Sequence, residues 1–189
     1  MVYQGKQASS SRPIRGQIAP DMFEEMLSIA RKKHKEVAPA LEIGYRAALR
    51  PHEVMSLKKG CYQSGSLHIP DKTANARNHR PRTTQKEIID PVARFMLEGL
   101  EEFTSGDYWA FNVKKYRDIF KKIAQELEWD EKYPNIIFDG PHCLRHGGML
   151  HIETILDQSA TPTPVKLQKM QISSSNIRRY TKPNHTRSN

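Results

Sequence analysis

The sequence predicts a mostly α-helical fold with one small antiparallel β-sheet, an α+β arrangement. Apolar residues recur at helical spacing over most of the central part of the chain, whereas only two short segments alternate as strands do. With 189 residues the chain is long enough for one domain with a real hydrophobic core, and no internal repeat divides it.

The first half of the chain contains three predicted helical segments. The first begins near Pro20 and places Met22 and Met26 on one apolar face. A second helix is expected from about Pro39 to Leu49, and the segment "RPHEVMSL" continues helically after Pro51.

A hairpin and three longer helices are expected next. "GSLHIPD" alternates as a strand does, "RPRTTQKEIID" is its expected partner, and the polar "KTANARNH" forms the connecting loop. Helices are predicted over Pro91–Phe103, over Asn112–Trp129 and from Pro141 onward. After the loop "SATPTP", two short helical pieces are expected around Val165–Met170 and Ser173–Tyr180.

The domain is expected to span residues 20–180, preceded by a flexible basic arm over residues 1–19 and followed by a short polar tail over residues 181–189. The net charge is +9 and the pI is about 9.6, which favours a polyanionic partner such as nucleic acid. Two stretches of the chain contain basic side chains and no acidic ones. The first has Lys72, Arg77, Arg80, Arg82 and Lys86, and the second has Lys166, Lys169, Arg178, Arg179, Lys182 and Arg187. Such segregation predicts a basic face that binds the partner, although solvated charge without any partner is the alternative.

Other features narrow the class of protein. Two cysteines do not make a disulfide framework, which indicates a reducing compartment. No apolar run is long enough to span a membrane, and the N-terminus lacks the apolar core of a signal peptide. We therefore expect a protein of the cytoplasm, at the nucleoid, or of the nucleus, without a membrane partner.

The segment "GPHCLRHGGMLH" concentrates chemistry on the helix after Pro141. His142, Arg145 and His146 share one helical face, which leaves a metal site, an anion site and a chance basic face open. A metal site is the weakest of these, because His142 and His151 lie about 180° apart at 100° per residue. No HExxH arrangement is present either, so no metal is predicted.

Four segments occur in an order that carries family information. Arg50 stands in "AALRPHEVMSLK", Lys72 ends a strand in "IPDKTANARNHRPR", His142 and Arg145 form the His-x-x-Arg motif, and Tyr180 ends "SSSNIRRY". This order resembles the catalytic domain of the tyrosine recombinases, the phage-integrase family, over about residues 21–180. The resemblance implies a mostly helical catalytic domain with a small sheet.

The resemblance also implies a role for each of these residues. Arg50 and Arg145 would grip the non-bridging oxygens of a DNA phosphate, which suits the planar, permanently charged guanidinium. His142 would accept a proton or hold the phosphate, and Lys72 would protonate the departing 5′ oxygen. Tyr180 would attack phosphorus and form a 3′-phosphotyrosyl link. Such a reaction needs no cofactor, because the covalent link conserves the bond energy.

Further residues take supporting roles in this interpretation. Glu53 would pair with a buried basic group, and His146 would be structural or support the site. Gln171 stands where the family usually has His or Trp, which predicts weaker stabilisation of the transition state. Taken without the resemblance, Lys72 is interchangeable with Arg77 or Lys86. DNA contacts are expected from Arg77, Arg80, Arg82, Lys86, Lys166, Lys169, Arg178 and Arg179.

The expected partner is double-stranded DNA, with a homotetramer on DNA as the assembly that recombination or integration of a mobile element requires. Family members usually carry an N-terminal helical DNA-binding domain that nineteen residues cannot supply, so we expect a catalytic-domain fragment or a minimal member. Three alternatives remain: a non-catalytic DNA-binding module of the same fold, a type IB topoisomerase, and, as the weakest, an RNA-binding domain.

Overall fold

The computed structural model describes residues 14–70 and 83–159. In chain order the elements are β1 (Ile14–Arg15), α1 (Pro20–Lys33), α2 (Ala38–Arg46), α3 (Pro51–Met55), β2 (Tyr62–Gln63), β3 (Ser66–Pro70), β4 (Thr83–Glu87), α4 (Pro91–Phe103), α5 (Val113–Glu126), α6 (Trp129–Lys132), β5 (Ile136–Ile137) and α7 (His142–Gln158). The predicted fold class, mostly helical with a small antiparallel sheet, is confirmed.

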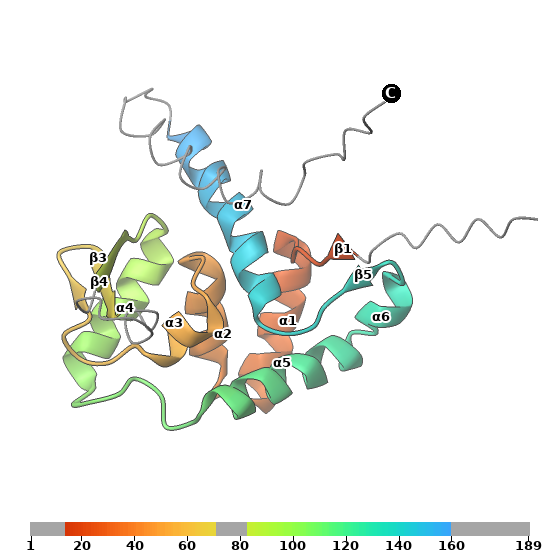
Figure 1. The fold of residues 1–189 in the computed structure, drawn as a ribbon, viewed down its shortest axis with the longest axis horizontal. Helices are drawn as coiled ribbons and strands as arrows, with labels where there is room; N and C mark the ends of the chain where they lie inside the picture. The colour runs from red at the N-terminus through yellow and green to blue at the C-terminus, as the bar shows by residue number, and fades with distance from the viewer. Residues whose placement is uncertain (1–13, 71–82, 160–189) are drawn as a thin grey trace, which may run out of the picture.

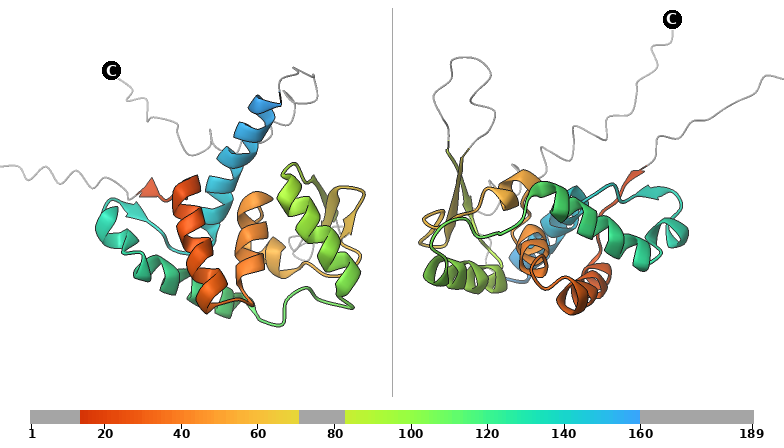
Figure 2. Two further views of the ribbon diagram at one scale, coloured as in Figure 1. Left: turned by 180° about the vertical axis from the view of Figure 1, so that it is seen from behind. Right: turned by 90° about the horizontal axis from the view of Figure 1, so that it is seen from below.

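The elements are arranged around α2 and the first half of α7. Helix α4 and the three-stranded sheet lie at one end of the molecule, and α5, α6, β1 and β5 lie toward the other (Figure 1). The second half of α7 projects beyond the neighbouring helices in Figure 1 and in the left view of Figure 2. None of the helices in the described part of the chain is long and apolar enough to cross a membrane.

A single cluster of buried side chains joins these elements. Its largest fully buried members come from α1, α2, α5 and α6 and include Phe23, Tyr45, Tyr116, Phe120 and Trp129. The predicted faces of the first helix and of the Asn112 helix are part of this core, as Met22, Met26 and Phe120 are buried. Burial of each such side chain stabilises the fold by about 1.5–3 kcal/mol.

The sheet has the strand order β2-β3-β4, and both pairings are antiparallel. The predicted hairpin between "GSLHIPD" and "RPRTTQKEIID" is therefore confirmed, with Leu67 opposite Lys86 and Ile69 opposite Thr84. Leu67 and Ile69 are buried, whereas Thr84 is exposed, and Lys86 is the half-buried residue of β4. The short strands β1, β2 and β5 were not predicted, because two residues are too few to show an alternating pattern.

The second predicted helix is shorter than expected. Helix α2 ends at Arg46 instead of Leu49, and Ala48 takes a left-handed conformation with φ of 48°. Arg50 is extended, as the residue before a proline tends to be, and the chain resumes a helical path at Pro51. The break separates α2 from α3 and re-orients the chain just before Arg50.

The predicted helix Asn112–Trp129 is also interrupted. Asn112 caps α5 by accepting a hydrogen bond from the backbone N–H of Lys115 at 3.0 Å, and α5 ends at Glu126. Glu128 has a φ of 56°, which turns the chain and lets the separate helix α6 begin at Trp129. The turn buries Trp129 against Phe138, so burial of a large aromatic side chain overrides the helical pattern.

Helix α7 buries a different face from the one the sequence predicted. Leu144 is buried as expected, but Met149 and Ile152 are only half-buried, and two glycines, Gly147 and Gly148, are buried instead. A Cβ atom at Gly148 would lie 1.9 Å from the carbonyl oxygen of Tyr45, and helices α2 and α7 are in direct contact. The glycine pair therefore lets α7 approach the backbone of α2 closely.

Candidate anion site

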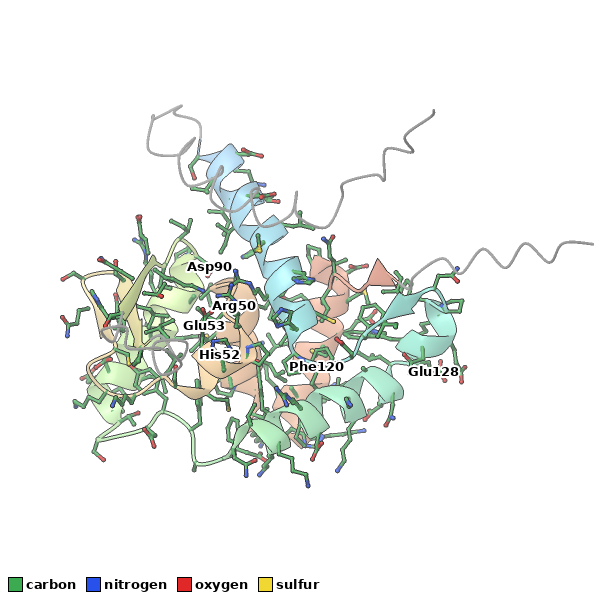
Figure 3. All side chains as sticks on the ribbon, viewed as in Figure 1. Arg50, His52, Glu53, Asp90, Phe120 and Glu128 are labelled. Carbon is green, nitrogen blue, oxygen red and sulfur yellow. The ribbon has the colours of Figure 1, made fainter. Side chains whose placement is uncertain are left out.

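The site begins at the left-handed turn between α2 and α3. This turn places Arg50 immediately before α3, where its side chain remains 42% exposed. Glu53 follows one turn later and its side chain is only 6% exposed. Arg50, His52 and Glu53 lie together near the centre of the molecule (Figure 3).

Glu53 is a buried carboxylate with several positively charged neighbours. Its Oε1 accepts a hydrogen bond from Nη1 of Arg50 at 3.0 Å. Its Oε2 accepts one from the backbone N–H of Arg50 and one from Nζ of Lys86, each at 2.7 Å. Arg145 Nη1 lies 3.7 Å from the same Oε2 atom. Glu53 thereby connects α3, β4 and α7, which are distant in the sequence.

These contacts determine the ionisation of the group. Burial opposes the charged form of Glu53, but Lys86, the backbone N–H of Arg50 and Arg145 outweigh it, so the pKa of Glu53 is lowered. Burial lowers the pKa of Lys86, while Glu53 acts in the opposite direction. Burial and the nearby Arg50 lower the pKa of Arg145, although a guanidinium stays protonated in proteins.

Arg145 is held by the turn that also presents Arg50. Its Nη1 donates a 2.9 Å hydrogen bond to the carbonyl oxygen of Ala48, and its side chain is 13% exposed. Ala48 is in the left-handed region, a strained conformation that costs about 1–2 kcal/mol for a residue with a Cβ atom. The turn thus fixes both arginines relative to each other.

His142 and His146 lie on the same face of α7 as Arg145. Their rings are 5.3 Å apart between centroids and nearly perpendicular, at 76°. The predicted shared face of His142, Arg145 and His146 corresponds to the half-buried positions of this helix, whereas Cys143 and Leu144 turn into the core. Cys143 is a buried small residue as predicted, and burial raises the pKa of its thiol to about 11.

The charges of this cluster favour an anionic ligand. Three cations, Arg50, Lys86 and Arg145, surround the single carboxylate of Glu53, which leaves a net charge of +2 when all four are ionised. Guanidinium groups bind phosphate oxygens with paired, charge-assisted hydrogen bonds. The arrangement therefore suits a phosphate ester, and it gives more stabilisation to a transition state that gains negative charge.

Several predicted site residues lie outside the described residues. They are Lys72, Arg77, Arg80, Arg82, Lys166, Lys169, Gln171, Arg178, Arg179 and Tyr180. Their roles, and the two short helices expected near the C-terminus, stay predictions. Of the predicted residues that are described, Arg50, Glu53, Lys86 and Arg145 come together, and His142 shares the α7 face with Arg145.

A second buried ionic cluster anchors α7 and was not predicted. Asp90 caps α4 by accepting the backbone N–H of Ala93 at 2.8 Å, and its other oxygen lies 2.6 Å from Nε2 of His151. Arg46 approaches the same oxygen at 3.4 Å. Burial raises the pKa of Asp90, but His151, the Ala93 N–H and Arg46 outweigh it, so the pKa is lowered. In the sequence, only the position of Asp90 before Pro91 points to this cluster, since aspartate there is typical of a helix cap.

This lowered pKa predicts how stability depends on pH. Asp90 binds a proton in the unfolded chain near its ordinary pKa of about 3.9, whereas the folded protein binds it only at lower pH. The contribution of ionised Asp90 to the free energy of unfolding is therefore fully present above the pKa of the unfolded chain. It is lost as the pH falls through the lower pKa of the folded protein. We expect the free energy of unfolding, measured with urea, to fall steeply below about pH 4.

The variant Asp90→Asn should reduce that slope because it removes the titrating group. Asp118→Asn, on the exposed surface of α5, should leave the slope unchanged and serves as the matched control. Equal slopes for Asp90→Asn and the unsubstituted protein would show that other carboxylates dominate acid unfolding.

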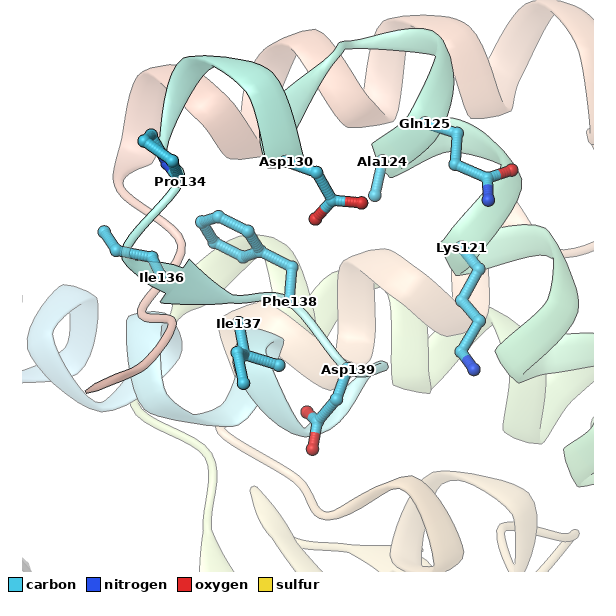
Figure 4. Close-up of a pocket in the computed structure, with 9 residues that line it drawn as sticks. All are labelled: Lys121, Ala124, Gln125, Asp130, Pro134, Ile136, Ile137, Phe138 and Asp139. Carbon is cyan, nitrogen blue, oxygen red and sulfur yellow. The ribbon is translucent and has the colours of Figure 1, made fainter. Parts of the chain in front are cut away.

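A separate pocket lies at the other end of the molecule, between α5, α6 and β5 (Figure 4). Its volume is about 420 Å³, and it is lined by Lys121, Ala124, Gln125, Asp130, Pro134, Ile136, Ile137, Phe138 and Asp139. It contains none of the residues of the cluster at Glu53. Within residues 14–70 and 83–159, no three histidine, cysteine or carboxylate side chains gather as metal ligands would.

Comparisons with known proteins support the fold. No protein-family model and no curated protein sequence matches the chain. Among solved structures, the Tn1549 transposon integrase in complex with transposon right end DNA matches with a TM-score of 0.52 at 11% identity, covering 88% of this chain and 68% of that one.

Two other solved structures match a somewhat smaller share of the chain. A lambda integrase dimer bound to a COC′ core site has a TM-score of 0.50 at 11% identity and covers 79% of this chain and 47% of that one. XerH site-specific recombinase bound to palindromic difH substrate has a TM-score of 0.50 at 14% identity, with 77% and 44% covered. This chain thus spans about half the length of these two proteins. Its fold is that of tyrosine recombinase catalytic domains, as the resemblance in sequence predicted.

Proposed function

We propose that this chain is the catalytic domain of a site-specific DNA recombinase or integrase, which cleaves and rejoins DNA through a 3′-phosphotyrosyl intermediate. The observation that carries the proposal is the gathering of Arg50 and Arg145 around Glu53, in a fold shared with proteins solved on their DNA sites. Guanidinium groups bind the oxygens of a phosphodiester with paired, charge-assisted hydrogen bonds, and the two stretches rich in lysine and arginine would hold the flanking DNA backbone.

The proposed reaction divides the work among five residues. Tyr180 attacks phosphorus through its hydroxyl oxygen and displaces the 5′ oxygen, and the bond to the 3′ side is kept as a phosphotyrosyl ester. His142 accepts the phenol proton, and Lys72 donates a proton to the departing oxygen. Arg50 and Arg145 stabilise the negative charge that develops on the two non-bridging oxygens. Rejoining reverses these steps, so no cofactor is consumed.

Double-stranded DNA is the proposed partner, at the bacterial nucleoid or in a nucleus, and a tetramer on DNA is the proposed assembly for complete strand exchange. The competing function is a non-catalytic DNA-binding module. It is favoured by Gln171, which has no charge at the position where the family usually has His or Trp.

The test is covalent capture of DNA by the full chain. Labelled, nicked duplexes of randomised sequence are incubated with the protein, and denaturing electrophoresis detects protein that stays attached to DNA. We expect an adduct with the unsubstituted protein and none with Tyr180→Phe, while DNA binding by this variant is unchanged. The loss should be complete, because phenylalanine has no nucleophilic oxygen.

Tyr133→Phe is the matched control, since Tyr133 is a partly exposed tyrosine at the end of α6. It should form the adduct normally. An adduct that persists in Tyr180→Phe would move the nucleophile to another tyrosine. DNA binding without any adduct in the unsubstituted protein would favour the non-catalytic module.

A further inference from the structure

Lys86 occupies a place that Arg145 could otherwise take. Each carboxylate oxygen has two lone pairs, and both on Oε2 of Glu53 are used, by the backbone N–H of Arg50 and by Nζ of Lys86, each at 2.7 Å. Arg145 Nη1 remains 3.7 Å from that oxygen, beyond hydrogen-bonding distance, and donates to the carbonyl of Ala48 instead. The three contacts together leave Arg145 without a tight bond to Glu53.

The sheet fixes Lys86 in this position. Lys86 is opposite Leu67 of β3, and its strand neighbours Gln85 and Glu87 are exposed, whereas the Lys86 side chain is only 21% exposed. Side chains alternate between the two faces of a strand, so Lys86 turns toward Glu53 while its neighbours turn to solvent. A surface lysine that only contacts DNA would not need this burial.

We propose that Lys86 is a positioning residue for DNA cleavage, acting through Glu53 to keep Arg145 and Arg50 directed at the scissile phosphate. The inference rests on the proposed function and is separate from the proton-donating role proposed for Lys72. Lys86 occupies Oε2 of the one carboxylate of the cluster, while Arg50 binds Oε1 at 3.0 Å. The charge of Arg145 is then left for the phosphate. Without Lys86, Glu53 would draw Arg145 into a close ion pair and cancel this charge.

The effect should be on reaction rate more than on DNA affinity. A phosphodiester carries one negative charge and gains a second as the nucleophile attacks, so a withdrawn guanidinium weakens the transition state more than the ground state. Flanking DNA contacts, which dominate affinity, do not involve Glu53. If Lys86 had only a structural role, its substitution would lower the stability of the protein but would not slow the reaction selectively relative to DNA binding.

The test uses the full chain and a nicked duplex selected for adduct formation from the randomised pool. The variants are Lys86→Met, which keeps the stem and removes the charge, Lys86→Arg, Glu53→Gln, and the double variant of Glu53→Gln with Lys86→Met. Lys122→Met, an exposed lysine on α5, is the control with the same loss of charge. Single-turnover rates at saturating protein and dissociation constants are measured separately.

We expect Lys86→Met to slow adduct formation on the order of 10²-fold, as a misplaced catalytic group does, with DNA affinity close to that of Lys122→Met. Lys86→Arg should recover most of the rate. The double variant should react as fast as Glu53→Gln alone and faster than Lys86→Met, because without the carboxylate nothing withdraws Arg145. The comparison of the double variant with Glu53→Gln does not depend on whether Lys86→Met alone folds.

A wild-type rate in Lys86→Met, or a double variant slower than Glu53→Gln, would overturn the inference while leaving the proposed function intact. A loss confined to DNA affinity would overturn it as well and return Lys86 to the DNA-contacting residues. If the unsubstituted protein forms no adduct with any duplex, the proposed function itself is overturned, and this inference with it.

Discussion

Replacing Arg145 by alanine is expected to slow formation of the covalent protein–DNA adduct on the order of 10³-fold, since removal of even one such donor costs about 10²–10³-fold. Arg145 is a half-buried cation whose guanidinium group is held by a 2.9 Å hydrogen bond to the carbonyl oxygen of Ala48. Its removal also leaves Glu53 with fewer positive neighbours. Arg145→Lys should retain only part of the wild-type rate of adduct formation, because an ammonium group cannot form the paired contacts of a guanidinium.

The measurement is a single-turnover adduct assay with the selected nicked duplex. Arg117→Ala removes an exposed arginine from α5 and should react at the wild-type rate. The deficit of Arg145→Ala should persist on a duplex with sulfur at the bridging 5′ position, because we propose that Arg145 stabilises the non-bridging oxygens. A deficit that disappears on the sulfur duplex would mean that Arg145 assists the leaving group instead.

The largest effect on stability is expected from Gly148→Ala. The added Cβ atom would lie 1.9 Å from the carbonyl oxygen and 2.9 Å from the carbonyl carbon of Tyr45, and 3.3 Å from Cα of Ala48. These are backbone atoms that cannot rotate away, so α7 must move off α2. We expect a loss of about 3 kcal/mol in the free energy of unfolding, although alanine favours a helix over glycine by about 1 kcal/mol.

Gly99→Ala is the matched control for this substitution. Gly99 lies inside α4, and a Cβ atom there meets no atom within 4 Å. It should therefore stabilise the protein by about 0.5–1 kcal/mol through helix propensity alone. Urea unfolding of both variants decides the matter, and equal stability of Gly148→Ala and the unsubstituted protein would contradict the close approach of α7 to α2.

Helices with strong local patterns were predictable from sequence. The span of α4 agrees with the prediction from Pro91 to Phe103, because a proline at its start and a clear apolar period define it. The C-terminal ends of α2 and α5 were not predictable, since Ala48 and Glu128 adopt left-handed conformations that no local sequence pattern indicates. The turn at Glu128 accompanies the burial of Trp129 against Phe138, a residue outside the helix.

The site was predictable only in part for a similar reason. Helical spacing grouped His142, Arg145 and His146 on one face, and the resemblance to the tyrosine recombinases added Arg50 and Glu53. The place of Lys86 beside Glu53 depends on the register of β4 against β3, which sequence alone leaves open. The pair of Asp90 and His151 was missed because its partners lie 61 residues apart.

Glu53 has both a structural and an electrostatic role, and this matters for the design of an inactive form of the protein. The same carboxylate accepts the backbone N–H of Arg50 at the start of α3, binds Lys86 on β4 and lies 3.7 Å from Arg145 on α7, so it connects three structural elements as well as three positive charges. A substitution of Glu53 alone could therefore lower activity either by disturbing the fold or by disturbing the site, and an activity assay would not separate the two. Under the proposed function, an inactive form that still binds DNA is better made with Tyr180→Phe, which removes only the proposed nucleophilic oxygen.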